Sequence, residues 1–402
     1  METKILKSLD TLGFAAEALR KGGMVGVPTE TVYGLCVNGL DPDAVAALYE
    51  IKGRPEVKPL SLMVAGSSAI DEYCLDVPRA AYTLADAFWP GPLTIVLRAD
   101  TALIPAIVRA GGETVGLRCP DHPLTLALLK KAALPLAGPS ANPSGQPSPK
   151  TAEDVLGYFN GRIDAVIDGG ACGFGRESTI IDLSRTPYRI LRQGALPRED
   201  ISAVLTKGVR VIGLTGGTGC GKSTALAVLK ERGALALDCD AIYHELLDTS
   251  DAMLSELREH FPAAFADGTL DRRTLGTTVF SDADALEALN AITHRYVKAE
   301  VTRRLEEFAW NGGTLAVIDA IALTESGLGS LCEFTVAVTA PEEQRLARIM
   351  ARDGIEREYA KARIAAQKEN ASFVSRCTYE LKNEKSEQDF INNCAAFFDS
   401  HL

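Results

Sequence analysis

Residues 211–230, VIGLTGGTGCGKSTALAVLK, carry the spacing of glycine, lysine and serine that binds nucleotide phosphates. Gly216 is followed after four residues by Gly221, Lys222 and Ser223, which fits the pattern G-x-x-x-x-G-K-[ST]. Glycines let backbone N–H groups converge on phosphate oxygens, the lysine adds positive charge beside the β- and γ-phosphates, and the serine hydroxyl can ligate Mg²⁺. A predicted strand before the loop and a predicted helix after it argue against a chance match. The predicted nucleotide-binding residues are Gly217, Thr218, Gly219, Cys220, Gly221, Lys222, Ser223 and Thr224, with Ser223 as the Mg²⁺ ligand.

Acidic and basic side chains farther along the chain could complete a phosphoryl-transfer site. The next predicted strand ends in ALDCDAIYH, so Asp238 and Asp240 emerge at the edge where a parallel sheet binds ligands. One of them could accept a proton from an attacking hydroxyl, although an aspartate there can also cap the following helix. In PEEQRLARIMARDG, Arg345, Arg348 and Arg352 recur about one helical turn apart. Arginines suit phosphates, and a solvated basic face is the alternative.

The first half of the chain carries weaker signals for binding a phosphorylated small molecule. Lys52, Arg54 and Lys58 lie in KGRPEVKPLSLMV, beside a predicted strand, and could neutralise a polyphosphate. Ser140 and Asn142 lie in the proline-rich segment GPSANPSGQPSPK, where their polar groups could hold a phosphate or a ribose. Each signal alone also fits an ordinary solvated turn, so these residues by themselves predict no particular reaction.

The elements that must position these residues form two α/β domains. The expected strands of the first half are 23–35, 60–65, 93–99, 114–120, 165–170, 178–184 and 188–194, and its expected helices are 12–21, 42–51, 78–88 and 123–132. This pattern predicts a mixed α/β twisted sheet. In the second half the expected strands are 209–214, 234–238, 314–319 and 334–340. Expected helices lie at 222–231, from the second strand to about residue 310, and after the last strand. Alternation predicts a parallel sheet with helices on both faces. We expect domains at residues 1–206 and 207–402.

Charge and composition limit the class of protein. The formal net charge is −11 and it is uneven, since residues 1–207 carry 21 basic and 23 acidic side chains and residues 208–402 carry 21 and 30. This balance disfavours a broad basic face for duplex nucleic acid but permits small basic pockets. The nine cysteines have no zinc-site spacing, and no apolar run is long enough to span a membrane. We therefore expect a cytoplasmic protein that makes no membrane contact.

The second half resembles the dephospho-CoA kinase family over nearly its whole length. The matching segments are IGLTGGTGCGKST, DCDAIYH, DGTLDRRTLGTTVF, ITHRYV, PEEQRLARIMARDG, AKARIAAQ and NEKS. The resemblance implies a P-loop kinase domain with a parallel sheet and a helical lid, which uses ATP to phosphorylate the ribose 3′-hydroxyl of dephospho-CoA. Asp240 then matches the catalytic base, Arg348 matches the lid arginine that steadies the transferring phosphoryl group, and Lys222 contacts the phosphates. The implied acceptor-binding residues are Arg272, Arg273 and His294.

Three positions depart from the pattern of that family. Ile321 replaces a proline in DAIALTE, Arg295 follows the histidine where proline is usual, and Arg345 stands where glutamine is common. These departures bear on the acceptor pocket more than on nucleotide binding. A different P-loop kinase of small metabolites is therefore the alternative for this half.

Residues 10–200 resemble the threonylcarbamoyl-AMP synthase family, whose fold is also described as double-stranded-RNA-binding. The matching segments are VPTETVYGL, KGR, VGLRCPDHP, SAN, ESTIIDL and ILRQGA. The resemblance implies synthesis of threonylcarbamoyl-AMP from L-threonine, bicarbonate and ATP, with release of pyrophosphate, for the t⁶A modification of tRNA. The implied threonine-binding residues are Thr31, Arg118 and Ser178. The implied ATP-binding residues are Lys52, Arg54, Lys58, Thr114, Ser140, Asn142, Ser148 and Arg192.

Both resemblances together predict a bifunctional enzyme with two ATP sites, one of which also uses Mg²⁺. The expected partners are dephospho-CoA, L-threonine, bicarbonate and separate proteins that complete the tRNA modification, and RNA contact stays open. The alternative is that the first half is a nucleic-acid-binding or scaffold module attached to an active P-loop kinase. The near-neutral charge of residues 1–207 argues against a broad nucleic-acid surface.

Overall fold

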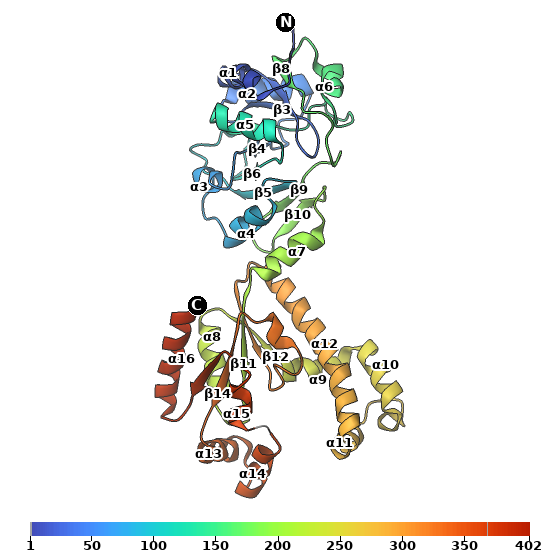
Figure 1. Cartoon of the computed structure of the whole chain (residues 1–402), viewed down its shortest axis with the longest axis vertical. Coiled ribbons are helices and arrows are strands. Elements are labelled where there is room, and N and C mark those ends of the chain that lie inside the picture. The colour runs from blue at the N-terminus through green and yellow to red at the C-terminus, as the bar shows by residue number, and fades with distance from the viewer. Residues whose placement is uncertain (1, 368) are drawn as a thin grey trace. The chain divides into compact units, whose positions relative to one another are not determined.

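The computed structural model describes residues 2–367 and 369–402 (Figure 1). The chain folds into two compact units. The first unit comprises the residues up to Gly208 together with Trp310–Gly312, and the second comprises Val209–Ala309 and Gly313–Leu402. The boundary expected after residue 206 falls in the last turn of helix α7, which spans Arg198–Lys207.

The first unit is built on a mixed sheet of ten strands in the order β1-β8-β2-β3-β7-β4-β6-β5-β9-β10. Parallel and antiparallel pairs alternate irregularly along it, since β4 pairs with β6 in parallel and with β7 in antiparallel orientation. The predicted mixed α/β architecture is therefore confirmed. The strands are β1 Lys4–Leu6, β2 Val25–Val27, β3 Gly34–Asn38, β4 Ser61–Met63, β5 Leu93–Arg98, β6 Thr114–Arg118, β7 Leu136–Ala137, β8 Ala165–Ile167, β9 Thr179–Asp182 and β10 Arg189–Arg192.

Helices of the first unit begin and end where local chemistry directs them. Helix α2 starts after Asp41, whose side chain accepts from two backbone N–H groups, and it ends at Gly53 in the left-handed region with φ 56°. Leu19 of α1 and Leu128 of α5 are fully buried in one apolar cluster with strand residue Val25. Besides α7, the α-helices of this unit are α1 Leu12–Arg20, α2 Pro42–Lys52, α3 Ala69–Tyr73, α4 Arg79–Phe88, α5 Pro123–Ala132 and α6 Ala152–Phe159.

One expected strand of the first unit is wrong. Residues 23–35 do not form a single strand, because the chain reverses between β2 and β3, which pair antiparallel. Pro28 cannot donate to a ladder, and the Thr29 hydroxyl accepts from the N–H groups of Thr31 and Val32 at 3.2 Å each. This local side-chain bonding makes a turn. The turn places Glu30 and Thr31 at the end of a strand pair, where they can face a ligand.

The second unit has a sheet of five parallel strands in the order β12-β13-β11-β14-β15, as the alternation predicts. Its strands are β11 Arg210–Thr215, β12 Leu235–Asp238, β13 Leu315–Asp319, β14 Phe334–Thr339 and β15 Tyr379–Lys382. Its α-helices are α8 Lys222–Glu231, α9 Cys239–Thr249, α10 Asp251–His260, α11 Arg272–Ser281, α12 Ala283–Trp310, α13 Glu342–Asp353, α14 Arg357–Ala365, α15 Asn370–Val374 and α16 Glu387–His401. The expectation of helices alone after β14 missed β15, an edge strand in which only Leu381 is buried.

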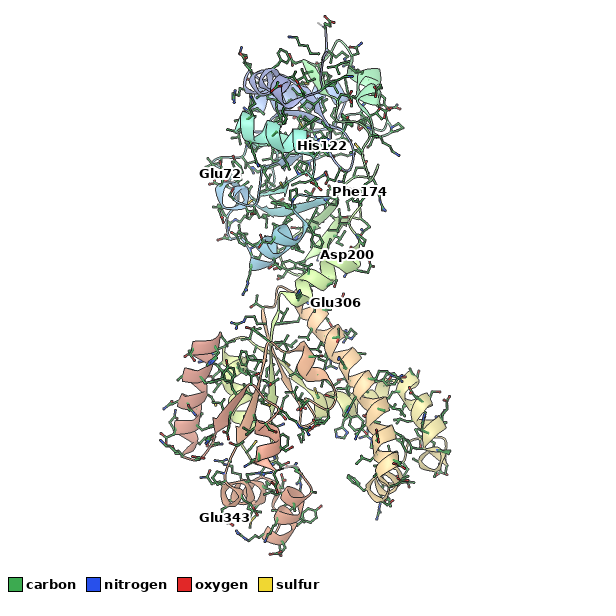
Figure 2. All side chains as sticks on the ribbon, in the orientation of Figure 1. Glu72, His122, Phe174, Asp200, Glu306 and Glu343 are labelled. Atoms are coloured by element: carbon green, nitrogen blue, oxygen red, sulfur yellow. The ribbon has the colours of Figure 1, made fainter. Side chains whose placement is uncertain are left out.

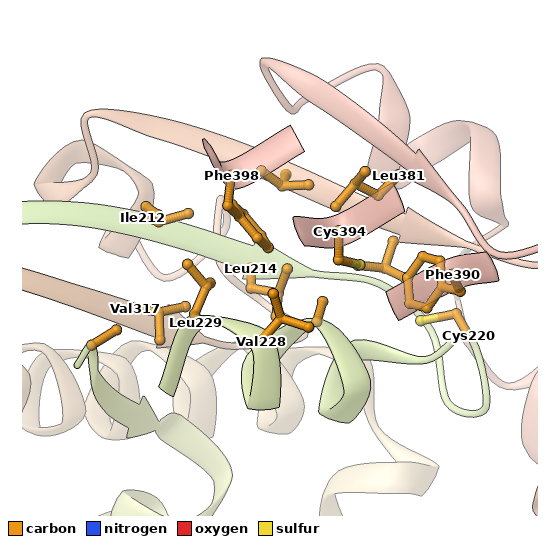
Figure 3. Close-up of a cluster of buried hydrophobic side chains, with 14 of the residues drawn as sticks. Ile212, Leu214, Cys220, Val228, Leu229, Val317, Leu381, Phe390, Cys394 and Phe398 are labelled. Carbon is orange, nitrogen blue, oxygen red and sulfur yellow. The ribbon is translucent and has the colours of Figure 1, made fainter. Parts of the chain in front are cut away.

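A continuous apolar core fixes the central strand of this sheet. Figure 3 shows Ile212 and Leu214 of β11 packed between side chains of α8 and α16, including Leu229 and Phe398. Cys220 belongs to the same buried cluster. Because β11 leads directly into the glycine-rich loop, this core anchors both ends of that loop.

Exposed acidic side chains occur on both units, among them Glu72 and Asp200 on the first and Glu343 on the second (Figure 2). Within the described part of the chain, no helix is long and apolar enough to cross a membrane.

Candidate active sites

The glycine-rich loop of the second unit needs glycine for steric as well as conformational reasons. Gly216, Gly219 and Gly221 have φ values of 142°, 81° and 106°, which other residues rarely adopt. A Cβ atom at Gly216 would also clash with the Val338 carbonyl oxygen, and one at Gly221 would clash with the Asn383 amide. The loop leads into the N-terminus of α8, where backbone N–H groups and the helix dipole favour an anion.

Lys222 is paired with a carboxylate that the sequence motif does not contain. Its Nζ lies 2.6 Å from Oδ1 of Asp319, and both side chains are largely buried, with 16% and 15% exposed. Burial raises the pKa of Asp319, and the neighbouring Lys222 charge opposes that change. Asp319 ends β13, which pairs with β11. The sequence could have indicated Asp319, because its carboxylate follows a predicted strand at the edge where a parallel sheet binds ligands.

The two aspartates at the end of β12 have different surroundings. The Asp238 side chain accepts from the N–H groups of Asp240 and Ala241 at 3.0 Å each and so caps α9. Asp240 instead lines a cavity of 690 Å³ that also contains Lys222. Capping therefore accounts for Asp238, whereas Asp240 forms part of the cavity wall.

That cavity gathers most of the residues that the loop motif predicts, together with arginines of α13 and α14. A second cavity of 230 Å³ contains His294 and shares Asp240 and Ile321 with the first. The first is lined by Gly217, Thr218, Gly219, Gly221, Lys222, Ser223, Thr224, Asp240, Asp319, Ile321, Arg348, Arg352, Arg363, Gln367, Asn383, Glu387 and Phe390. The side chain of Cys220 is buried in the apolar core, and Cys220 is not among the described residues that line this cavity.

The other two predicted acceptor residues are not among the described residues that line either cavity. Both, Arg272 and Arg273, lie in the first turn of α11. Arg272 forms an ion pair with Asp248. Of the three, only His294 therefore lies beside Asp240.

Two of the three arginines of α13, Arg345 and Arg348, contact the loop, whereas Arg352 is exposed and bonds its neighbour Asp353. Arg348 donates to the Gly219 carbonyl at 3.3 Å and to Oδ1 of Asn383 at 3.0 Å. Asn383 in turn donates to the Cys220 carbonyl at 2.9 Å. Arg345 is buried with 4% exposed. Sequence reasoning missed Asn383 as a site residue, because only the pairing of β15 with β14 brings it to the loop.

In the first unit, a cavity of 170 Å³ collects five of the predicted residues: Arg54, Arg118, Ser140, Ser178 and Arg192. Val32, Gly34, Met63 and Glu177 also line it. Three arginines around so small a space make it suited to an anionic ligand.

Arg118 is held at this cavity by a buried ion pair. Its Nη2 donates to Oε1 of Glu30 and to Oγ1 of Thr31, both at 2.7 Å. The side chains of Arg118 and Glu30 are 8% and 11% exposed. The other oxygen of Glu30 accepts from the Asp121 N–H at 3.0 Å. Glu30 was missed from the sequence, although it lies inside the segment VPTETVYGL.

Another group of residues that line this cavity is organised around Ser178. Arg192 donates to the Ser178 carbonyl at 2.8 Å and to its hydroxyl at 3.0 Å, and the hydroxyl of Thr94 lies 2.8 Å from that of Ser178. Ser148 donates to Glu177 at 2.7 Å, and this bond lowers the pKa of Glu177. Ser148 is not itself among the described residues that line the cavity, but it bonds Glu177, which is.

The three cations of KGRPEVK do not face one space. Lys52 is buried, and its ammonium donates to the carbonyl oxygens of Ser140 and Asn142. Burial lowers the pKa of Lys52 to about 7, and the Arg54 charge adds to the effect. Lys58 is exposed. Of the three, only Arg54 lines the cavity. Lys52 instead acts as a clamp on the proline-rich loop, because its ammonium bonds two carbonyl groups of that loop.

Two other predicted ATP-binding residues are not at the cavity wall either. Thr114 begins β6, opposite Arg98. Asn142 is buried, and its amide nitrogen donates to the Pro143 and Gln146 carbonyls at 2.9 and 2.7 Å. Its Oδ1 has no hydrogen-bond partner among the described residues. Asn142 therefore shapes the loop and keeps one buried acceptor available.

We expect Lys52→Met to lower the free energy of unfolding of the first unit by about 1–3 kcal/mol, because the carbonyl groups of Ser140 and Asn142 would lose a buried donor. Hydrogen–deuterium exchange in urea, read on peptides from residues 1–208, would measure this change. Lys58→Met is the matched control, since its side chain is exposed, and it should leave exchange near wild type. Equal exchange in both variants would contradict the clamp.

Comparisons with known proteins divide the chain in the same two parts. A family model described as "Telomere recombination" (Sua5/YciO/YrdC) matches residues 17–194, and one described as "Dephospho-CoA kinase" matches residues 210–389.

Residues 2–367 and 369–402 contain no group of three or more His, Cys, Asp or Glu side chains that could hold a metal ion.

Curated relatives carry the same two descriptions. Threonylcarbamoyl-AMP synthase of Pyrococcus abyssi is 44% identical over 191 residues, covering 48% of this chain and 56% of that protein. The synthase of Halorhodospira halophila is 39% identical over 168 residues, covering 42% and 87%. Dephospho-CoA kinase of Symbiobacterium thermophilum is 42% identical over 161 residues, covering 40% and 67%. The chain spans about half the length of the first of these curated relatives.

Proposed function

The chain belongs to the threonylcarbamoyl-AMP synthase family through its first unit and to the dephospho-CoA kinase family through its second, and from this premise we propose that it catalyses both reactions. The second unit phosphorylates the 3′-hydroxyl of dephospho-CoA with ATP. The first unit makes L-threonylcarbamoyl-AMP from L-threonine, bicarbonate and ATP, and releases pyrophosphate.

The observation that carries the kinase proposal is the position of Asp240, which lines both the loop cavity and the cavity that contains His294. ATP phosphates bound at the loop and an acceptor bound beside His294 would meet at this carboxylate. The acceptor oxygen attacks the γ-phosphorus, the bond from the γ-phosphorus to the bridging oxygen breaks, and ADP leaves. Asp240 takes the hydroxyl proton, while Lys222 and Arg348 offset the charge on the phosphoryl oxygens.

The donors at the loop suit Mg²⁺, which binds through one or two carboxylates, a hydroxyl and phosphate oxygens. Ser223, Asp319 and Asp240 all line the same cavity. A site of this kind needs no dedicated cluster of three protein carboxylates. Bound Mg²⁺ would neutralise phosphate charge, and the proposed protein ligand remains Ser223.

The synthase proposal is supported by the three arginines that line the first cavity, Arg54, Arg118 and Arg192. Arg118 is fixed by bonds from Nε to the Gly91 carbonyl and from Nη2 to Glu30 and Thr31, and its Nη1 group can receive the threonine carboxylate. Arg54 and Arg192 line the same cavity and can receive ATP phosphates. Holding the carbamate near the α-phosphorus then favours their reaction by proximity. Proteins that finish the t⁶A modification would be separate partners in the cytoplasm.

Two assays on the full chain test these proposals. Dephospho-CoA with ATP and Mg²⁺ should give CoA and ADP, and L-threonine with bicarbonate and ATP should give pyrophosphate in a threonine-dependent manner. Tight RNA binding without pyrophosphate release would favour a nucleic-acid module for the first unit. ATP hydrolysis that responds to another small hydroxyl compound, but not to dephospho-CoA, would favour a different kinase.

We expect Arg348→Lys to lower kcat of the kinase by about tenfold with a smaller change in KM for ATP. The lysine keeps one charge but loses the planar group that contacts Gly219 and Asn383 together, and such contacts matter most in the transition state. Steady-state kinetics at saturating dephospho-CoA would measure the split. Arg232→Lys, at an arginine that bonds Asp399, is the control, and wild-type turnover in Arg348→Lys would refute the assignment.

A further inference from the structure

Gln367, which follows the end of α14 at Ala365, is joined to the phosphate loop by a network of hydrogen bonds. Oε1 of Gln367 accepts from the Thr218 N–H at 2.8 Å, and Nε2 of Gln367 donates to the Thr218 hydroxyl at 2.6 Å. Arg345 donates from Nη2 to Oε1 of Gln367 at 3.1 Å and from Nε to the Thr218 carbonyl at 2.9 Å. The backbone N–H, carbonyl and hydroxyl of one loop residue are therefore all held by two side chains from outside the loop.

These contacts are closely packed over Gly217. Arg345 has only 4% of its surface exposed. A Cβ atom at Gly217 would clash with Nη2 of Arg345 and would lie 3.1 Å from Oε1 of Gln367. Gly217 is not among the described glycines that have a positive φ. A preference for glycine at this position therefore comes from the side chains packed over it and not from its backbone conformation.

We propose that Gln367 is a positioning residue for nucleotide binding, and that Arg345 holds it in place. Gln367 occupies the Thr218 N–H, so the phosphates are received by the N–H groups from Gly219 onward and by the start of α8. The same contact anchors the end of α14, whose Arg363 lines the cavity together with Gln367. The inference rests on the proposed nucleotide site and is independent of the identity of the acceptor.

The loss of ATP affinity that follows removal of the contact between Gln367 and Thr218 can be predicted. Removing the Gln367 amide breaks two hydrogen bonds to Thr218 and leaves Arg345 with one partner fewer. We expect Gln367→Ala to weaken ATP binding by about tenfold, the equivalent of one or two hydrogen bonds. Gln367→Glu keeps an acceptor for the Thr218 N–H and for Arg345, but places a negative charge at the phosphate cavity. It should therefore keep the unfolding temperature of wild type while binding ATP more weakly.

Calorimetric titration of the full chain with ATP and Mg²⁺ tests the proposal. The set comprises Gln367→Ala, Gln367→Glu, Thr218→Val and the double variant Thr218→Val/Gln367→Ala. Because Gln367 acts through Thr218, the double variant should bind ATP little more weakly than Gln367→Ala alone. Gln388→Ala is the matched control, since Gln388 is exposed and bonds Asn392 on its own helix, and it should bind ATP as wild type does.

Wild-type ATP affinity in Gln367→Ala, or effects that multiply in the double variant, would overturn the proposal. An unfolding temperature lowered equally in Gln367→Glu and Gln367→Ala, with ATP affinity unchanged in both, would show a purely structural role. A wild-type protein that binds ATP but makes no CoA would refute the kinase function and leave this inference standing. A wild-type protein that binds no ATP would refute both.

Discussion

Asparagine in place of Asp240 is expected to lower kcat for phosphorylation of dephospho-CoA by about 10²–10⁴-fold, the usual contribution of a general base. Asparagine has nearly the same shape but cannot take the 3′-hydroxyl proton. The side chain lies where the two cavities of the second unit meet, so the substitution changes the chemistry without opening a void. Rapid-quench measurement of CoA formation at saturating ATP and dephospho-CoA would give the rate.

Asp238 supplies the matched control two residues away. Its carboxylate caps α9 through bonds of 3.0 Å to two N–H groups, and asparagine caps a helix as well as aspartate does. Asp238→Asn should therefore keep both turnover and stability, while Asp238→Ala should lower the free energy of unfolding by about 1 kcal/mol. If Asp238→Asn lost more turnover than Asp240→Asn, the proton acceptor would be Asp238.

The architecture follows from the sequence wherever an element has its own strong pattern. The alternating segments around β11, α8, β12 and β13 were predicted because each carries its own apolar run and turn signals. Short strands were missed because they depend on partners far along the chain. β1 pairs with β8, and β15 is an exposed edge strand on β14. Neither strand has enough buried side chains to be recognised from its own short stretch of sequence.

The candidate sites divide in the same way. The phosphate loop is readable because its glycines, Lys222 and Ser223 are contiguous. Asp319, Asn383 and Gln367 were not selected, because only the strand order β13-β11-β14-β15 and the end of α14 bring them to the loop.

Burial changes the role of a charge in a way that spacing cannot show. Lys52 has the spacing of a phosphate ligand, but the structure buries its ammonium against two backbone carbonyls. In the sequence, Glu30 is a polar residue within an expected strand. In the structure, the turn after Pro28 brings Glu30 into an ion pair with Arg118.

Arg118→Met is expected to abolish detectable threonine-dependent pyrophosphate release and to lower the free energy of unfolding by about 3–5 kcal/mol. The first effect follows if Arg118 receives the threonine carboxylate. The second follows because Glu30, with 11% of its side chain exposed, would be left as an unpaired buried charge. A single substitution cannot separate these two causes, since a destabilised unit would also lose activity.

The double variant Glu30→Gln/Arg118→Met separates them. Removing both charges relieves the unpaired carboxylate, so most of the lost stability should return, and Gln at position 30 can still accept from the Asp121 N–H. Pyrophosphate release should nevertheless remain absent, because the threonine carboxylate still has no arginine to bind. Kinase turnover of the same preparations reports whether the second unit is intact. Recovery of pyrophosphate release together with stability would show that Arg118 only balances Glu30, and threonine would then have to be bound by other residues of the cavity.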